Sequence, residues 1–468
     1  MDTSKLSEYL LIWMAVMGLV ALVRWRRKMP SAGLTLAYLL NLSLIHWIGA
    51  AVYVLPAFQN QDLRLTELGL EQSLYGLLAF AFGGLILTPI LASRGWLPRS
   101  KAAHQPDPRL PKAYMACGVA FYLLLTSTSL GHLPTATAIV SSGQQLIVAG
   151  LALCCWKAWR ENQVRRLIGW LLLAFLLPVT TLVRAGALGA GAIALLTLLI
   201  FVSGFVRSPF KIALVALPLL YLGLSVFVTY MRDRTDIRVT VWGGQSLSDR
   251  LDRLSETVAT FEWFDPANFH HLQRIDARLN QNWLVGAAVN RLHETDGYAR
   301  GDTLWDALLA LIPRALWPDK PILAGSGDLV NRYTDIKFAP GTSVGIGQVL
   351  EFYANFGTTG VVIGFAIMGL VITVLDYQAA DRLARSDLQG FVLWLLPGIA
   401  LLQVNGQLVE LTASAAASLV VALLTNKYLD RLQKRDVGGA PFEPTGVPFG
   451  HAGTSVDGSL INGPQQII

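Results

Sequence analysis

The sequence predicts an all-α, polytopic integral membrane protein. Hydrophobic residues make up 53% of the 468 residues, charged residues only 15%, and the mean hydropathy is +0.48. Soluble globular domains carry roughly 25% charged residues, so this composition does not fit an ordinary water-exposed surface. Long apolar runs recur along the chain, and positive charge gathers on alternate connections between them. Together these observations indicate helices that cross a bilayer in alternating directions.

Eleven apolar runs are candidate spans, because a helix needs roughly 17–25 residues to cross about 30 Å of hydrocarbon. The last two runs are short. The expected spans are 7–23, 33–55, 70–92, 113–130, 137–156, 167–182, 186–206, 212–230, 357–377, 390–406 and 409–425.

The distribution of Lys and Arg predicts the orientation. The first run lacks a small-residue cleavage site and is followed by Arg24, Arg26, Arg27 and Lys28, which predicts a retained anchor. The connections after runs one, three, five, seven and nine, with the C-terminal tail, hold 21 of the 37 Lys and Arg residues. By the positive-inside rule, we expect the N-terminus outside and the C-terminus inside.

Four regions follow from this layout. We expect helices one to eight over 1–230, an outer, periplasmic insert over 231–340, helices nine to eleven over 341–430, and a disordered cytoplasmic tail over 437–468. The insert holds 13 Lys plus Arg against 15 Asp plus Glu, so it is near neutral and not a nucleic-acid surface. Periodic apolar residues predict insert helices over 247–262 and 276–292, and 303–312 is expected to lie in the membrane interface.

The segment Ile312–Pro321 places two cations beside prolines at the membrane surface. Its prolines interrupt a helix, so Arg314, Trp317 and Lys320 are expected on an exposed loop. Arginine offers phosphate a planar fork of donors, and lysine offers a compact charge. These residues therefore favour an anionic lipid headgroup. The alternative is an interfacial belt whose cations pair with Asp319 and Asp328.

Two longer runs carry a resemblance. The run GDTLWDALLALIPRALWPDKP and the later TSVGIGQVLEFYANFGTTGVVIGF are similar to the O-antigen and exopolysaccharide polymerases. The resemblance implies a fold like the type C glycosyltransferases and an enzyme that joins lipid-linked repeat units in the bacterial inner membrane. The matching residues are Gly301, Pro313, Arg314, Trp317, Pro318, Lys320, Pro321, Glu351, Tyr353, Asn355, Phe356 and Gly357.

A second resemblance lies in TLVRAGALGAGAIALL, which is similar to the Ser-Arg-Gly-type turn of these polymerases and of the related O-antigen ligases. Arg184 takes the place of the arginine. Val183 and Ala185 flank it, so the hydroxyl of that pattern is missing. An arginine between apolar runs either binds an anion or snorkels to the interface, and both readings stay open for Arg184.

The resemblance and the residue chemistry suggest roles. Arg314 and Lys320 would stabilise a departing pyrophosphate, and Glu351 is the preferred general base, with His293, Asp296 and Asp328 as rivals. Glu351 could instead stabilise a helix N-terminus.

Four further residues are expected to contact substrate. Arg291 and Arg332 are expected to bind the substrate together with Arg184, although loop arginines are commonly solvated or in weak ion pairs. Trp317 and Tyr353 could stack on sugars or simply anchor the protein at the interface.

The implied reaction polymerises undecaprenyl-pyrophosphate-linked oligosaccharide units on the periplasmic face. The donor carries its own activated leaving group, so no ATP, nucleotide sugar or other cofactor is expected. The seven histidines show no metal-binding spacing. Expected partners are the lipid-linked glycan, membrane lipids and a chain-length regulator, with no nucleic acid. The alternatives are an O-antigen ligase and a non-enzymatic flippase or transporter of lipid-linked oligosaccharides.

Overall fold

The computed structural model describes residues 3–27, 29–58, 61–98, 107–127, 134–206, 208–312, 317, 319–321, 324–338 and 344–438. Every regular element in these residues is helical, and none is a strand. The all-α prediction is thus confirmed for the described chain. Most of the predicted tail, and Arg314 with Pro313 and Pro318, lie outside the described residues.

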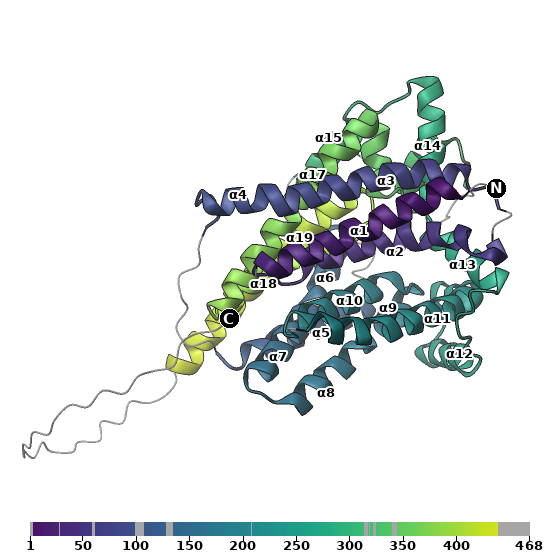
Figure 1. Cartoon of the computed structure of the whole chain (residues 1–468). Coiled ribbons are helices and arrows are strands. Elements are labelled where there is room, and N and C mark those ends of the chain that lie inside the picture. Colours follow the sequence, from purple (N-terminus) through teal and green to yellow (C-terminus); the bar gives the residue numbers. More distant parts are fainter. Residues whose placement is uncertain are drawn as a thin grey trace, which may run out of the picture.

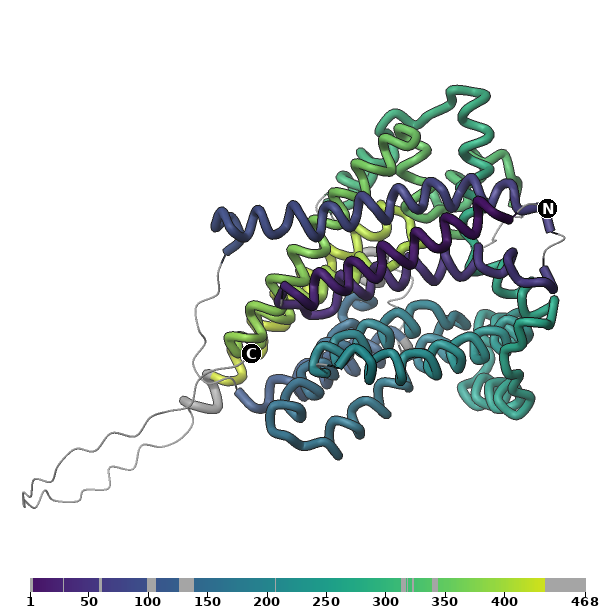
Figure 2. Tube along the Cα trace, viewed as in Figure 1, coloured from purple at the N-terminus to yellow at the C-terminus, as the bar shows by residue number. Residues whose placement is uncertain are grey.

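The helices form two groups that lie beside each other (Figures 1 and 2). The first group contains α1 (Ser4–Arg27), α2 (Leu34–Ala51), α3 (Arg64–Phe82), a π-helix η3 (Gly83–Leu87), α4 (Thr88–Ser93), α17 (Gln348–Ala384), α18 (Leu388–Ala400) and α19 (Leu408–Gly438). The second group contains α5 (Leu110–Ser127), α6 (Pro134–Gly143), α7 (Gln145–Arg160), α8 (Val164–Ala174), α9 (Leu176–Ala185), α10 (Gly189–Ser203) and α11 (Pro209–Trp242).

Eight helices are long and apolar enough to cross a membrane, and three shorter apolar helices accompany them. The shorter ones are Leu110–Leu125, Gly189–Ser203 and Leu388–Ala400. Each of the eleven expected spans overlaps one of these helices. The chain is therefore a multi-pass membrane protein by the length and composition of its helices.

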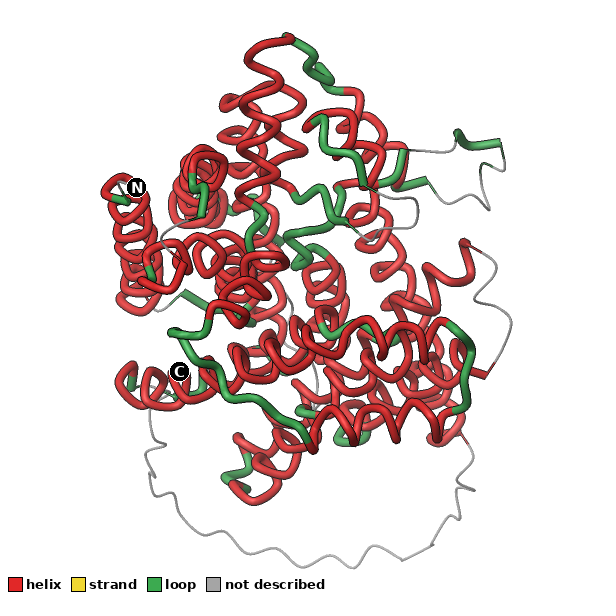
Figure 3. The backbone as a smooth tube through the Cα atoms, turned by 90° about the vertical axis from the view of Figure 1, so that its right-hand side faces the viewer, coloured by secondary structure: helices red, strands yellow, loops and turns green. Residues whose placement is uncertain are grey.

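Short helices of the expected insert gather at one end of the molecule, which we call the insert end. These are α12 (Leu247–Ala259), α13 (Phe269–Leu279), α14 (Asn282–Thr295), α15 (Asp302–Ala310) and α16 (Ser326–Thr334). Figure 3 views the molecule from this end. The arginine-rich connections lie at the opposite end, which we call the basic end. Two of them are in contact there, since Arg160 donates to the Ser386 hydroxyl at 3.1 Å.

Three helix boundaries differ from the sequence-based expectation. The helix α11 continues past 230 to Trp242, so the insert begins inside a continuous helix. The helix expected over 276–292 is two helices, because the Asn280 side chain accepts from the Asn282 backbone at 3.1 Å and turns the chain. The ninth span begins at Gln348 instead of 357, and its helix is interrupted at Phe356–Gly357.

Asp376 joins three helices near the basic end. Gly33, in a left-handed conformation, offers no side chain to cap α2, and Asp376 of α17 takes that role. Its Oδ1 accepts from the Ala32 backbone at 2.6 Å, and its Oδ2 accepts from the Thr35 hydroxyl at 2.7 Å. Arg24 of α1 donates to Oδ2 at 2.7 Å, and both side chains are buried. Hydrogen bonding and opposite charge offset the cost of burying this carboxylate.

A second buried polar network fixes α14 to α2 and α3. His46 Nδ1 lies 2.7 Å from Asn282 Oδ1, and the Ser73 hydroxyl donates to the same oxygen at 3.1 Å. Asn282 donates back to the His46 carbonyl at 2.8 Å. These groups are buried and therefore do not contact a substrate. The network instead positions α14 and the insert that follows it.

Candidate functional site

The structure describes only part of the predicted cation-bearing segment Ile312–Pro321. Lys320 is buried, and its Nζ donates to the Ile312 carbonyl at 3.1 Å. The burial of Lys320 differs from the exposed loop position expected from the sequence. Trp317 is half-buried. The roles of Lys320 and Trp317 in binding pyrophosphate and sugar stay predictions.

Glu351 lies in the first turn of α17 and is completely buried. Its Oε2 accepts from the Leu408 backbone N–H at 2.7 Å, so the carboxylate caps the start of α19. Its Oε1 makes no well-formed hydrogen bond among the described residues, although the Thr303 hydroxyl lies beside the carboxylate. Glu351 thus stabilises a helix N-terminus, as the alternative interpretation held, but of α19 and not of its own helix. One oxygen stays available to a proton or a ligand.

Asn355 attaches the insert to α17. Its Oδ1 accepts from the Gly301 backbone at 2.9 Å, and its Nδ2 donates to the Thr303 hydroxyl at 2.7 Å. Ala299 N donates to the Ala354 carbonyl at 2.8 Å. The carbonyls at the end of the first segment of α17 are therefore satisfied by the chain entering α15. This docking gives Asn355 a structural role.

The helix α17 breaks directly after Asn355. Gly357 has φ 61° and ψ −149°, a conformation that is open to glycine and strained for other residues. Phe356 precedes it with non-helical angles and a half-exposed side chain. The short segment 348–355 and the longer segment 358–384 are thus separate helical pieces.

The remaining predicted residues near the insert have different surroundings. Tyr353 is buried with its ring 6.3 Å from that of Tyr298. Arg291 forms an ion pair with Asp335 at 2.6 Å, as expected for a loop arginine. Arg332 on α16 is exposed. Among these three, Tyr353 is buried, Arg291 is partly exposed but paired, and Arg332 is exposed; their contacts with substrate stay predictions.

Arg184 lies at the end of α9, away from the Glu351 region in the fold. Its Nη1 donates to Gln144 Oε1 at 2.6 Å, so this half-buried guanidinium has a neutral partner. The carbonyls that end α9 are capped from α11 and α12. Tyr230 donates to the Gly186 carbonyl at 3.0 Å, and Trp242 donates to the Ala185 carbonyl at 3.2 Å. The turn that carries Arg184 is therefore held firmly.

Two further arginines contact this turn, and two more lie near one of them. Arg250 of α12 donates to the Val183 carbonyl at 3.3 Å, and the Arg238 side chain lies against Gly186. Arg234 lies close enough to Arg238 and Arg278 for mutual repulsion. Burial, then repulsion from Arg238, lowers the pKa of the Arg278 guanidinium. We call the five residues the arginine cluster: Arg184, Arg234, Arg238, Arg250 and Arg278.

Acidic side chains of the insert are bound to other arginines. Glu262 accepts from Arg232 at 2.8 Å and from Arg274 at 2.7 Å. Arg253 pairs with Asp236 at 3.0 Å. In the described parts of the chain, no carboxylate forms an ion pair with Arg184, Arg234, Arg238 or Arg250. The insert is near neutral as a whole, but its acidic residues pair with arginines on one side and leave the other side cationic.

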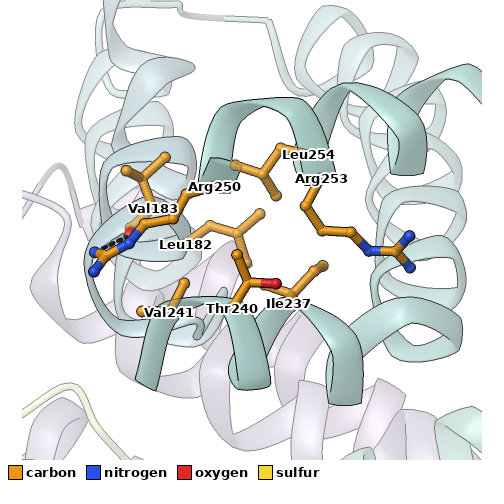
Figure 4. Close-up of a pocket in the computed structure, with 8 residues that line it drawn as sticks. All are labelled: Leu182, Val183, Ile237, Thr240, Val241, Arg250, Arg253 and Leu254. Carbon is orange, nitrogen blue, oxygen red and sulfur yellow. Dashed lines mark hydrogen bonds between the residues drawn. The ribbon is translucent and has the colours of Figure 1, made fainter. Parts of the chain in front are cut away.

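Figure 4 shows how α12 achieves this sorting. Leu182, Ile237 and Leu254 form an apolar contact between α9, α11 and α12. Arg250 and Arg253 leave this contact on opposite sides, Arg250 toward the turn of α9 and Arg253 toward the acidic residues. One helical turn of α12 therefore contributes one arginine to the cluster and one to the ion pairs.

Sequence reasoning found Arg184 but missed the other members of the cluster. The signal was present in the i, i+4, i+8 spacing of Tyr230, Arg234 and Arg238, which places them on one face of a helix. The balanced charge of 231–340 hides this face, because α11 continues through the expected start of the insert to Trp242. The pairing of acids with Arg232, Arg253 and Arg274 depends on tertiary contacts.

No group of three or more potential metal-ligating side chains gathers in the described residues. Cys154 and Cys155 are buried free thiols, and Cys117 is a half-buried one.

Comparison with known families finds one match. A family model described as Domain of unknown function (DUF8712) matches residues 102–427. No curated protein and no solved structure matches the chain significantly.

Proposed function

Because this chain belongs to the DUF8712 family, whose description states no activity, we propose a function from the site itself. The protein binds undecaprenyl-pyrophosphate-linked oligosaccharides at the insert end and polymerises them by glycosyl transfer in the bacterial inner membrane. The observation that carries this proposal is the arginine cluster, whose members gather around the ends of the apolar helices α9 and α11.

The cluster suits a pyrophosphate attached to a lipid. Like charges held together in partly buried positions are costly, and a bound polyanion offsets that cost. Arginine forks bind phosphate oxygens in pairs. The cluster lies where α9 and α11 end, so a ligand there can keep a hydrocarbon tail in the membrane and a glycan outside. A soluble phosphate has no hydrocarbon tail and would lack the attachment to the membrane.

The transfer step needs charge stabilisation and a proton acceptor. The acceptor hydroxyl attacks the anomeric carbon, the bond from that carbon to the pyrophosphate oxygen breaks, and the electron pair leaves with undecaprenyl pyrophosphate. Arginines that contact this leaving group stabilise its growing charge. Glu351, whose Oε1 makes no hydrogen bond among the described residues, is the proposed acceptor of the hydroxyl proton. This assignment requires the pyrophosphate end of the donor to lie between the arginine cluster and the start of α17.

Two alternative functions share this chemistry in part. An O-antigen ligase would use the same donor and the same cluster. A flippase or transporter gains one argument from the structure, since α17 is discontinuous at Phe356–Gly357 and transporters bind substrates at broken helices. The break is occupied by the chain entering α15, which favours the enzyme proposal.

The first experiment measures binding of undecaprenyl pyrophosphate to the purified full-length protein in detergent. The double variant Arg234→Gln/Arg238→Gln should bind about a hundredfold more weakly, because each charged hydrogen bond contributes roughly 1.5–3 kcal/mol. Arg300→Gln is the matched control, since Arg300 is exposed at the insert end and lies outside the cluster. Equal affinity of the double variant and the control would refute the pyrophosphate site.

The second experiment separates enzyme from transporter. Wild-type protein in detergent, where no compartments exist, should lengthen lipid-linked repeat units without added nucleotide. Adding lipid A core as a second acceptor tests the ligase alternative, because a ligase transfers the glycan to that acceptor instead. Tight binding without elongation or transfer, together with lipid movement between leaflets of reconstituted vesicles, would favour transport.

A further inference from the structure

Trp242, the last residue of α11, is held in a fixed orientation beside the arginine cluster. Its indole N–H donates to the carbonyl of Ala185, the residue after Arg184, at 3.2 Å. The Arg238 guanidinium, one turn earlier on α11, lies over the indole at 4.8 Å from the ring centroid. A hydrogen bond at its edge and a cation–π contact on one face thus hold the ring in place.

The indole is largely open to a ligand despite these two contacts. Trp242 is 61% exposed, so the side of the ring away from Arg238 is accessible. An aromatic ring with a fixed orientation loses little conformational entropy when a ligand packs on it. Its polar N–H already has a partner, so covering the ring leaves no donor unsatisfied. The residue therefore offers a preformed apolar surface next to the cations.

Arg238 connects this surface to the rest of the arginine cluster. It contacts the indole through the flat face of its guanidinium, which leaves the N–H donors at the edge for phosphate oxygens. Its Nε is buried and has no hydrogen-bond partner among the described residues. A phosphate bound by Arg238 therefore places the group that is ester-linked to that phosphate beside Trp242.

The position of Trp242 along α11 argues against a membrane anchor, which is the common role of tryptophan at a bilayer surface. Trp242 follows the charged part of α11, which contains Arg232, Asp233, Arg234, Asp236 and Arg238. Hydrocarbon disfavours such a density of charge. Trp263 is better placed for anchoring, because it stacks on Tyr221 in the apolar part of α11. From Tyr221 to Trp242 the helix rises roughly 30 Å along its axis, so the two indoles lie at different depths.

We infer that the indole of Trp242 binds the sugar that is attached to the pyrophosphate of the lipid-linked substrate. The ring C–H groups of a pyranose form an apolar face that packs on the indole, while the phosphates contact the arginine cluster. This inference rests on the proposed function and deepens it. The site then recognises the first sugar of the glycan as well as the pyrophosphate.

The experiment compares two lipids of equal charge, undecaprenyl-pyrophosphoryl-glucose and methyl undecaprenyl pyrophosphate, in which a methyl group replaces the sugar. Binding of each to the purified full-length protein is measured in detergent. Trp242→Leu should weaken binding of the glucosyl lipid about tenfold and of the methyl lipid no more than about twofold, because only the sugar packs on the ring. Trp242→Phe keeps a flat aromatic face and should bind the glucosyl lipid within about threefold of the wild type.

Trp263→Leu is the matched control, since Trp263 is 59% exposed and lies outside the cluster. Equal losses for both lipids in Trp242→Leu would show that Trp242 only orders the turn of α9, and would overturn the inference. An equal loss of glucosyl-lipid binding in Trp263→Leu would overturn it as well. If both lipids bind and Trp242→Leu changes neither affinity, the pyrophosphate site stands and only the sugar contact is rejected. If the wild type binds neither lipid, the proposed function itself fails.

Discussion

Single buried carboxylates have distinct tasks in this protein, and their hydrogen bonds show which. Asp376 accepts bonds from the start of α2 and is matched by Arg24, which makes it a structural group. Glu351 has one oxygen engaged by α19 and one without a partner among the described residues, which makes it a structural group with spare capacity. Neither difference is visible in the sequence, where both are single acids in apolar surroundings.

Substitution of Glu351 should separate its two tasks. Glu351→Gln retains an oxygen for the Leu408 N–H, so we expect unchanged thermal stability in detergent but loss of glycan elongation. Glu351→Ala removes the cap as well and should lower stability by about 1 kcal/mol. Wild-type elongation by Glu351→Gln would leave helix capping as the only role of this residue and point to His293, Asp296 or Asp328 as the base.

Loss of the Asp376 carboxylate should be far more damaging. Asp376→Asn leaves the Arg24 guanidinium buried without a counter-charge, and we expect a loss of about 3–5 kcal/mol in the free energy of unfolding. The measurement is thermal or denaturant unfolding in detergent. Arg385→Gln, which disrupts the more exposed pair with Asp381, should cost less than about 1 kcal/mol. A similar loss in both variants would show that the Arg24–Asp376 pair has no special weight.

At the scale of elements, the sequence predicted what depends on local pattern and missed what depends on docking. The apolar helices and the helix over 247–262 follow from periodicity, and α12 at Leu247–Ala259 confirms the latter. The break in α17 could not be predicted, since it arises where Ala299 and Gly301 take over hydrogen bonds of α17. The arginine cluster was missed for the same reason, because the acidic residues of the insert pair with other arginines through contacts between helices.

The docking of α12 and α13 on α11 should depend on pH through Glu262. Burial favours the neutral form of Glu262, but hydrogen bonds from Arg232 and Arg274 outweigh it and lower the pKa to about 2. A free glutamate titrates near about 4.3. Since the folded pKa is the lower one, this carboxylate stabilises the docked insert above about pH 4.3, and that stability is lost as the pH falls toward about 2.

Trp263 stacks on Tyr221 of α11, and the difference in fluorescence between the wild type and Trp263→Phe isolates its emission from that of the other tryptophans. We expect its emission to shift as the pH falls from about 5 to about 2.5, and Glu262→Gln to abolish this shift. His271 Nε2 lies 3.2 Å from Glu262, so His271→Gln is measured alongside. Persistence of the full shift in Glu262→Gln would assign the transition to other carboxylates.

At the scale of the whole molecule, the described ends of the chain lie at opposite ends of the helix groups (Figure 1). Basic connections gather at one of these ends and the insert helices at the other. The charge asymmetry of the sequence therefore has a clear spatial counterpart, although the side of the membrane that each end faces stays a prediction.

Cysteine labelling in intact spheroplasts measures that orientation. In a variant without Cys117, Cys154 and Cys155, a cysteine at Ser255 should react with an impermeant thiol reagent. A cysteine at Glu161 should react only after permeabilisation. Both positions are exposed, so access through the protein does not differ between them. Reaction at position 161 in intact cells would reverse the orientation and place the arginine cluster in the cytoplasm.

The partners of Asp376 also bear on what can be cut from this chain. Family similarity begins at residue 102, yet Asp376 and Asn282 lie inside the matched region while Arg24, His46 and Ser73 precede it. A fragment trimmed to the conserved boundaries would expose an ionised carboxylate to hydrocarbon and leave the amide of Asn282 unmatched. The region that the family model matches, residues 102–427, is therefore shorter than the part of the chain that folds together. Any expressed version of this region must also include α1–α4.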